Sequence, residues 1–178
     1  GWRLKRAQHE GNLKKALGKK DKKLFIFDAT AGLLSDTMIF LSLGHKVVAV
    51  EQSKILFCLV NDAIQRARDK IPYLNNLEFL NDNSQLVYKK QDKVFDAIYL
   101  DPMYPIIKKS TKKRGSINNI KQILEIENLA SDEEEIIDIF MKYNYKKIIV
   151  KRPLKSEKKY SNINYQVKGK TTRFDIYI

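Results

Sequence analysis

KKLFIFDATAGLLSD, residues 22–36, is the stretch that decides the fold. Its first half is an apolar and aromatic run with strand propensity, and it ends in polar residues from Asp28 onward. Its second half holds Gly32, which permits a tight turn. An apolar segment, 35–44, follows. Ser35 is suited to cap a helix there, and a glycine ends it. A buried strand that passes through a tight turn into a helix is the repeating unit of parallel α/β folds.

The same alternation continues along the chain. We expect strands over 22–30, 45–52, 76–82, 94–102 and 146–153, and helices over 35–44, 53–70, 116–130 and 131–143. The segment 163–178 alternates in polarity on both sides of Gly169 and Lys170, which predicts a terminal antiparallel hairpin. The sequence therefore predicts one α/β domain over 21–178, with a mainly parallel sheet and a C-terminal antiparallel hairpin. Residues 1–20 are expected to form a basic N-terminal segment that is truncated at its start, because the chain does not begin with Met.

Composition limits the classes of function. The 178 residues suffice for one domain with its own core, and the net charge of +13 suits a polyanionic partner or an anionic membrane surface. A lysine-rich coding bias is the competing explanation. No apolar run approaches the roughly 18 residues of a membrane span. Cys58 is the single cysteine, so the chain cannot form an internal disulfide, and this favours a reducing, cytoplasmic location. As a small apolar residue, Cys58 is expected to be buried. His9 and His45 stand apart from other ligands, so no metal site is expected.

Ligands of open parallel sheets bind beyond the C-terminal ends of the strands. Asp28 and Gly32 form a D-x-x-x-G pattern after the first predicted strand, and Glu51 ends the second. A carboxylate at that place can accept both hydroxyls of a ribose. No G-x-G-x-x-G is present to hold the pyrophosphate of a dinucleotide. These features favour a nucleoside cofactor without a diphosphate, and S-adenosylmethionine is the leading candidate. Taken alone, the D-x-x-x-G pattern is equally typical of a structural turn.

The third predicted strand ends in FLNDNS, residues 79–84. Asp82, Asn83 and Ser84 are able to hydrogen-bond the adenine edge of such a cofactor. A simple turn stabilised by an Asx side chain is the alternative.

The fourth strand ends in AIYLDPMYP, residues 97–105. The exocyclic amine of a nucleobase is a weak nucleophile, and an enzyme assists it by accepting its hydrogens. Asp101 offers a carboxylate and Pro102 a carbonyl, while the prolines fix the backbone of the turn. Tyr104 is able to stack on a base that has been flipped out of its helix. We expect Asp101, Pro102 and Tyr104 to be catalytic; a proline-rich turn with a half-buried tyrosine is the alternative.

Three basic segments, 108–114, 151–159 and 168–173, follow or join strand ends. Phosphate contacts from such segments give strong, sequence-independent affinity for nucleic acid. The residues expected to contact RNA are Lys108, Lys109, Lys112, Lys113, Arg114, Lys151, Arg152 and Arg173.

Four motifs occur together in this chain: DATAGL..D at 28–36, YLDPMYP…KKS at 99–110, VKRP at 150–153 and KG..TRFDIY at 168–177. In order and spacing they resemble the bacterial 16S ribosomal RNA guanine-N2 methyltransferases of the RsmJ type, from about residue 11 to the end. The resemblance implies a Rossmann-like class I methyltransferase sheet of seven strands. It also implies methyl transfer from S-adenosylmethionine to the N2 amine of one guanosine, with 16S rRNA or the small ribosomal subunit as partner and no metal or membrane.

The resemblance also implies a set of cofactor contacts. With the residues named above, the expected cofactor site consists of Asp28, Thr30, Gly32, Ser35, Asp36, Glu51, Gln52, Asn83, Ser84 and Asp101. Asp101 is expected at the junction of cofactor and substrate. The chain departs from the family pattern at Ser35 and Gln52, where the family usually has arginine.

Two other functions are compatible with these residues. Methyltransferases of adenine N6 or cytosine N4 use a similar acidic and aromatic turn, usually with proline where Met103 stands. A non-catalytic RNA-binding module that keeps the fold is the second alternative, and cofactor binding distinguishes it from an enzyme.

Overall fold

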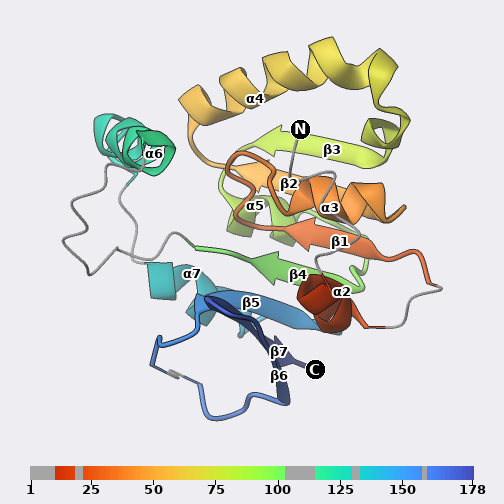
Figure 1. Ribbon diagram of the computed structural model, residues 1–178, viewed down its shortest axis with the longest axis vertical. Coiled ribbons are helices and arrows are strands. Elements are labelled where there is room, and N and C mark those ends of the chain that lie inside the picture. Colours follow the sequence, from red (N-terminus) through yellow and green to blue (C-terminus); the bar gives the residue numbers. More distant parts are fainter. Residues whose placement is uncertain (1–10, 19–21, 103–114, 130–132, 158–159) are drawn as a thin grey trace.

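The computed structural model describes residues 11–18, 22–102, 115–129, 133–157 and 160–178. Seven strands form one sheet in the order β3-β2-β1-β4-β5-β7-β6 (Figure 1). Their bounds are β1 Phe25–Asp28, β2 Lys46–Glu51, β3 Leu77–Asn81, β4 Ala97–Leu100, β5 Ile148–Pro153, β6 Tyr165–Lys168 and β7 Thr172–Tyr177. Strands β1 to β5 pair in parallel, whereas β7 is antiparallel to both β5 and β6. The predicted mainly parallel sheet with an antiparallel C-terminal hairpin is confirmed.

Helices cover both faces of this sheet (Figure 1). Their bounds are α2 Gly11–Leu17, α3 Thr37–Ser42, α4 Lys54–Ala67, α5 Ser84–Lys89, α6 Gly115–Ile126 and α7 Glu133–Phe140, with 3-10 turns at Arg68–Lys70 and Pro72–Asn76. Helices α2, α3 and α4 pack on one face and α5 and α7 on the other. Among the described segments, no helix has the length and apolar character needed to cross a membrane.

Alternating strand residues supply the two cores. In β1, Ile26 packs with the α3 side while its neighbour Phe27 packs with the α7 side, and both are fully buried. This period of two follows from the pleat of a strand, which points successive side chains to opposite faces. Because both faces are covered, the central strands are continuous apolar runs, as parallel sheets require.

The structure corrects several local predictions. Asp36, not Ser35, occupies the N-cap of α3, and it makes no side-chain cap hydrogen bond. Ser53 caps α4, since its hydroxyl accepts from the Leu56 N–H at 3.0 Å. Helices α2 and α5 were not predicted, and α2 contributes three buried residues to the core, upstream of the predicted domain start at 21. Cys58 is exposed, contrary to the prediction, because it lies on the outer side of α4.

The topology brings the chemically important strand ends together. The arrowheads of β1, β3 and β4 point to the same side in Figure 1, as parallel pairing requires. Asp28 ends β1, Glu51 ends β2 and Asp101 follows β4, so their side chains meet at one edge of the sheet.

Candidate functional site

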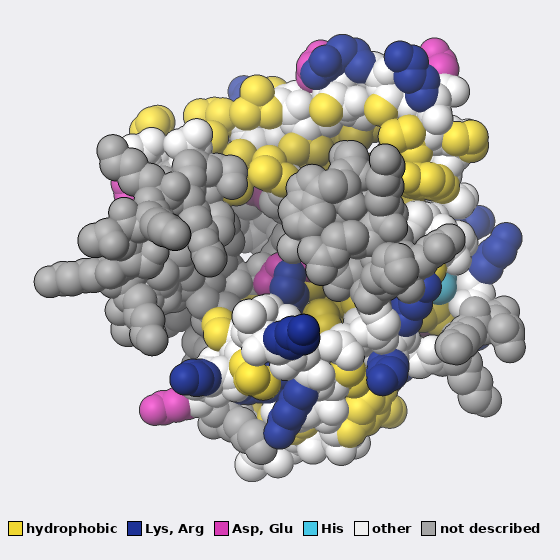
Figure 2. Space-filling model, in the orientation of Figure 1, with side chains coloured by type: hydrophobic (Ala, Val, Ile, Leu, Met, Phe, Trp, Pro, Cys, Tyr) yellow, Lys and Arg dark blue, Asp and Glu magenta, His cyan; other side chains and the backbone are white. Residues whose placement is uncertain are grey.

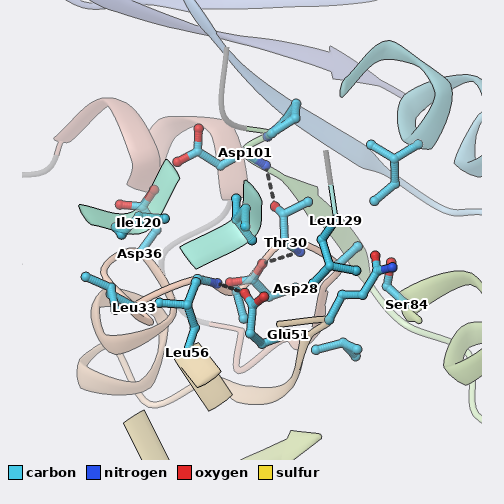
Figure 3. Close-up of a pocket in the computed structure, with 18 of the residues that line it drawn as sticks. Asp28, Thr30, Leu33, Asp36, Glu51, Leu56, Ser84, Asp101, Ile120 and Leu129 are labelled. Carbon is cyan, nitrogen blue, oxygen red and sulfur yellow. Dashed lines mark hydrogen bonds between the residues drawn. The ribbon is translucent and has the colours of Figure 1, made fainter. Parts of the chain in front are cut away.

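A cavity of about 450 Å³ opens at this edge (Figure 3). Its volume lies in the range typical of small-molecule sites. Polar residues from the ends of β1, β2, β3 and β4 form one part of its wall. The apolar part consists of Leu33, Leu56, Ile120, Leu124, Leu129 and Ile136, from the loop after β1, from α4, from α6 and its end, and from α7.

Asp28 organises the loop after β1. Its Oδ1 accepts from the Thr30 N–H at 3.2 Å, and its Oδ2 accepts from the Thr37 hydroxyl. Burial raises the pKa of Asp28 to about 7, since these two hydrogen bonds offset the desolvation only in part and the charges of Asp36 and Asp101 add to it. Asp28, which was expected to contact the cofactor, lines the cavity, but both of its oxygens hold the loop in place.

Gly32 lies at the turn of that loop with φ of +50°. A Cβ at this position would meet no atom within 4 Å, so the cavity extends directly over the glycine backbone. The Gly32 N–H donates to Glu51 Oε2 at 2.8 Å (Figure 3). The two predicted cofactor elements, the glycine turn and the acid after β2, are therefore in direct contact.

Glu51 is buried, and its Oε1 accepts from the Ser53 N–H at 2.7 Å. Burial raises the pKa of Glu51; backbone hydrogen bonds from Ser53 and Gly32 oppose this rise, and the charge of Glu127 adds to it. A carboxylate offers about four acceptor positions, so the two backbone donors leave capacity for ribose hydroxyls. Gln52 and Thr30, which were also expected to contact the cofactor, line the same cavity.

The end of β3 is divided between the cavity and a helix cap. Ser84 lines the cavity together with Asp82. Asn83 is instead the N-cap of α5, and its Oδ1 accepts from the N–H groups of Gln85 at 2.9 Å and Leu86 at 3.3 Å. The structure thus assigns Asn83 a local structural contact and does not place it in the cavity wall.

A charged network lies at the end of β4. Lys151, in β5, places its Nζ 2.7 Å from Asp36 Oδ2 and 2.7 Å from Asp101 Oδ2. The hydroxyl of Tyr99, in β4, donates to the same Asp36 oxygen at 2.7 Å. The Asp101 N–H donates to Thr30 Oγ1 at 2.7 Å, which ties the start of the turn to the loop after β1 (Figure 3). Ser35 and Pro102 complete this side of the wall.

The prediction that Lys151 contacts phosphate is therefore corrected: the ammonium is bound to two carboxylates. Burial lowers the pKa of Lys151, but attraction to Asp101 and Asp36 outweighs it and raises the pKa above its ordinary value, so the group stays charged. Burial also raises the pKa of Tyr99 far above its ordinary value, and the neighbouring acids add to this. Tyr99 was not predicted as a site residue, although its position two residues before Asp101 places it on the α3 face of β4.

Arg152 and Arg173 are also corrected. Both guanidinium groups are buried beside Asp175, with Arg173 Nε 2.9 Å from Asp175 Oδ1 and Arg152 Nε 3.4 Å from Asp175 Oδ2. Arg173 also donates to the Pro153 and Leu154 carbonyls. A buried arginine in these contacts stabilises the join between β5 and β7 and presents no surface to a phosphate.

Helix α6 closes another side of the cavity, which the sequence did not predict. Just after α6, the Glu127 carboxylate accepts from the Ser53 hydroxyl and, at 3.1 Å, from the Ile55 N–H. These bonds fasten the end of α6 to the start of α4, and so hold Ile120 and Leu124 over the cavity.

Some predicted residues lie outside the described ranges: Tyr104, Lys108, Lys109, Lys112, Lys113 and Arg114. Within the described ranges, no group of three or more His, Cys, Asp or Glu side chains is arranged to hold a metal ion.

Comparison with known proteins gives a consistent assignment. A family model described as "Putative SAM-dependent methyltransferase" matches residues 2–178. Ribosomal RNA small subunit methyltransferase J of Francisella tularensis subsp. novicida is 37% identical over an alignment of 168 residues, and the alignment covers 90% of this chain and 68% of the relative. The protein of that name from Francisella philomiragia is 34% identical over 165 residues, with the same coverage of both chains.

Solved structures agree. The SAM-dependent methyltransferase NGO1261 of Neisseria gonorrhoeae superposes with a TM-score of 0.70 at 26% identity, covering 94% of this chain and 70% of its own. Haemophilus influenzae HI0767 has a TM-score of 0.59 at 17% identity, covering 94% and 85%, and supports the fold alone. These matches confirm the Rossmann-like class I sheet and the S-adenosylmethionine cofactor, and the chain belongs to the RsmJ-type family of S-adenosylmethionine-dependent methyltransferases.

Proposed function

We propose that this protein methylates the exocyclic N2 amine of a guanosine in 16S rRNA, as free RNA or within the small ribosomal subunit, and that it does so in the cytoplasm. One observation carries the proposal. Asp101, at the end of β4, shares a cavity with Gly32 and Glu51 in a chain 37% identical to relatives named for the small-subunit RNA.

The residues present fit S-adenosylmethionine. The volume suits a nucleoside-sized ligand, the wall combines apolar side chains with carboxylates, and the space over Gly32 would be filled by any Cβ. Glu51 would accept the ribose hydroxyls, and Asp82 or Ser84 would face the adenine. When bound, the cofactor supplies an electrophilic methyl group on a sulfonium.

Asp101 acts on the substrate amine. A carboxylate accepts hydrogen bonds from N–H groups, which localises the nitrogen lone pair and orients it. The amine loses one proton as its nitrogen gains the methyl group, and Asp101 or water accepts that proton. Lys151 does not accept it, because its raised pKa keeps it protonated.

Lys151 positions Asp101. Its ammonium binds Asp101 Oδ2 and Asp36 Oδ2 together, so it links the acid after β4 to the N-cap of α3. Tyr99 fixes Asp36 from the side of the sheet. Asp101 is therefore bound to a lysine that a second, fixed carboxylate also holds, and such support keeps the Asp101 side chain in a defined orientation toward its substrate.

The test is transfer from methyl-labelled S-adenosylmethionine to unmethylated 16S rRNA and to 30S subunits, followed by digestion to nucleosides. We expect N2-methylguanosine from at least one substrate, and at least 100-fold less from an Asp101→Asn control that still binds the cofactor. Labelled N6-methyladenosine or N4-methylcytidine would instead assign the chain to the alternative amine methyltransferases. Cofactor binding without any transfer would contradict the proposal.

A further inference from the structure

A second charged surface lies at the edge of the sheet opposite the cavity. The parallel strands begin there, and lysines precede or open four of them. We call this the strand-start surface; its exposed lysines are Lys22, Lys23, Lys46, Lys89, Lys90, Lys93, Lys142 and Lys146. Figure 2 shows part of it as dark blue side chains along the right-hand side, where the strands of Figure 1 begin.

Few acids offset these lysines. Within the segments 22–23, 89–96 and 142–146, which carry most of these lysines, the acidic residues are Asp92 and Asp96. The Asp96 Oδ1 lies 3.3 Å from the Nζ of Lys22 and 3.3 Å from the Nζ of Lys146. Those two lysine side chains nevertheless remain 67% and 57% exposed. Elsewhere in the described ranges, acidic side chains slightly outnumber basic ones. The positive excess of the described chain is therefore concentrated at the strand starts, where a uniform lysine bias would not place it.

Aromatic rings hold some of these ammonium groups in position. Lys89 Nζ lies 5.8 Å from the centre of the Tyr143 ring, and Lys93 Nζ lies 5.8 Å from that of Phe25. Tyr88 stacks on Tyr143 at 5.4 Å. Since these rings are packed against the core, they do not offer free faces to nucleobases. The surface is therefore suited to contact phosphate groups, and such contacts do not depend on the nucleotide sequence.

We propose that the strand-start surface binds the phosphate backbone of a second segment of the rRNA substrate, distant from the nucleotide in the cavity. This rests on the proposed function. The strands have four to six residues, and at about 3.3 Å per residue they separate the two edges by roughly 13–20 Å. The edges face opposite directions, so a short hairpin in the cavity does not reach both. A folded RNA of several helices does, which makes a large folded RNA or the subunit the preferred substrate.

The test compares two triple variants with equal charge change. The surface variant is Lys89→Gln, Lys90→Gln and Lys93→Gln, at and just after the end of α5. The control is Lys15→Gln, Arg66→Gln and Arg68→Gln, exposed residues on the face of the sheet that α2 and α4 cover, opposite to α5, and outside the cavity wall. Binding to full-length 16S rRNA and to a hairpin carrying the target guanosine, both unmethylated, is measured from 50 to 300 mM salt. We expect the surface variant to bind full-length RNA about tenfold more weakly. Its plot of log affinity against log salt should be shallower by roughly two.

The hairpin separates this proposal from the proposed function. The surface variant should methylate the hairpin at the wild-type rate and lose kcat/KM only on the full-length substrate. If both variants bind full-length RNA as tightly as the wild type, or if both lose affinity to the same extent, the proposed RNA contact at the strand-start surface is wrong. Loss of binding to phosphatidylserine vesicles with unchanged RNA affinity would assign it to membranes and also overturn it. Wild-type protein that methylates neither RNA refutes the proposed function, while the binding comparison still decides the surface.

Discussion

Replacing Lys151 by methionine is the most informative perturbation of the charged network. Methionine keeps much of the side-chain volume but removes the ammonium that binds Asp36 and Asp101. The carboxylates of Asp36 and Asp101 then lose the cation that they share, so both the stability of the fold and the orientation of Asp101 should decrease.

The magnitude follows from burial. Breaking a fully buried ion pair costs about 3–5 kcal/mol, whereas exposed pairs contribute about 0.2–1 kcal/mol. Lys151 and Asp36 are 18% and 10% exposed, but Asp101 is 34% exposed. We therefore expect Lys151→Met to lower the free energy of unfolding by roughly 2–3 kcal/mol, between these limits. The cofactor carries one more positive charge than its product, so the ratio of S-adenosylmethionine to S-adenosylhomocysteine affinity should rise.

Urea unfolding measures the first effect and calorimetric titration of both ligands the second. Lys151→Arg is the matched control that keeps the charge and should recover most of the stability. A double-mutant cycle with Asp36→Asn should show coupling of at least 0.5 kcal/mol. A loss below about 0.5 kcal/mol in Lys151→Met, together with an unchanged affinity ratio, would refute the reasoning.

Three further predictions follow from other parts of the site. The pKa of Asp28 is about 7 in the folded protein, above its unfolded value, so the free energy of unfolding should decrease as pH rises from about 4 to 7 and Asp28 loses its proton. Urea unfolding at pH 5 and at pH 7.5 should show this decrease in the wild type, and in Asp28→Asn the decrease should be smaller by roughly 2–3 kcal/mol. Gly32→Ala and Gly44→Ala should each cost about 1–2 kcal/mol for a positive φ, but only the first should weaken cofactor binding by tenfold or more, as calorimetry would show. Asp175→Asn should lower the free energy of unfolding by about 3 kcal/mol because two buried guanidinium groups lose their counter-charge; a loss under 1 kcal/mol would contradict this.

The positions of the strands along the chain were predictable because the strands are apolar runs bounded by polar residues. Once strands alternate with helices, the rule for parallel sheets places the residues after β1, β2 and β4 at one edge. Asp28, Glu51 and Asp101 do line a single cavity there. The short helices were harder, because the six residues of α5 span less than two turns and show no clear periodicity. Its start was nevertheless visible, since Asn83 is a favoured N-cap residue.

The partners of the buried charges could not be predicted from spacing. Lys151 and Arg152 are adjacent in VKRP, and the pleat of β5 sends them to opposite faces of the sheet. Lys151 meets Asp36, which is far away in the chain, while Arg152 faces Arg173 across the β5–β7 pairing, beside Asp175. In a basic chain, Lys151 and Arg152 are interpreted from sequence as exposed surface charges. Only the folded structure shows that the carboxylates of Asp36 and Asp175 lie beside them.

The position of the cofactor is the central claim, and a crystal structure with S-adenosylhomocysteine tests it most directly. We predict that the ribose hydroxyls lie within hydrogen-bond distance of Glu51 and the sulfur on the side of the cavity formed by Asp101 and Pro102, with Lys151 still bound to Asp101. Density for the ligand at any other edge of the sheet, or an Asp101 carboxylate turned away from the sulfur, would contradict it.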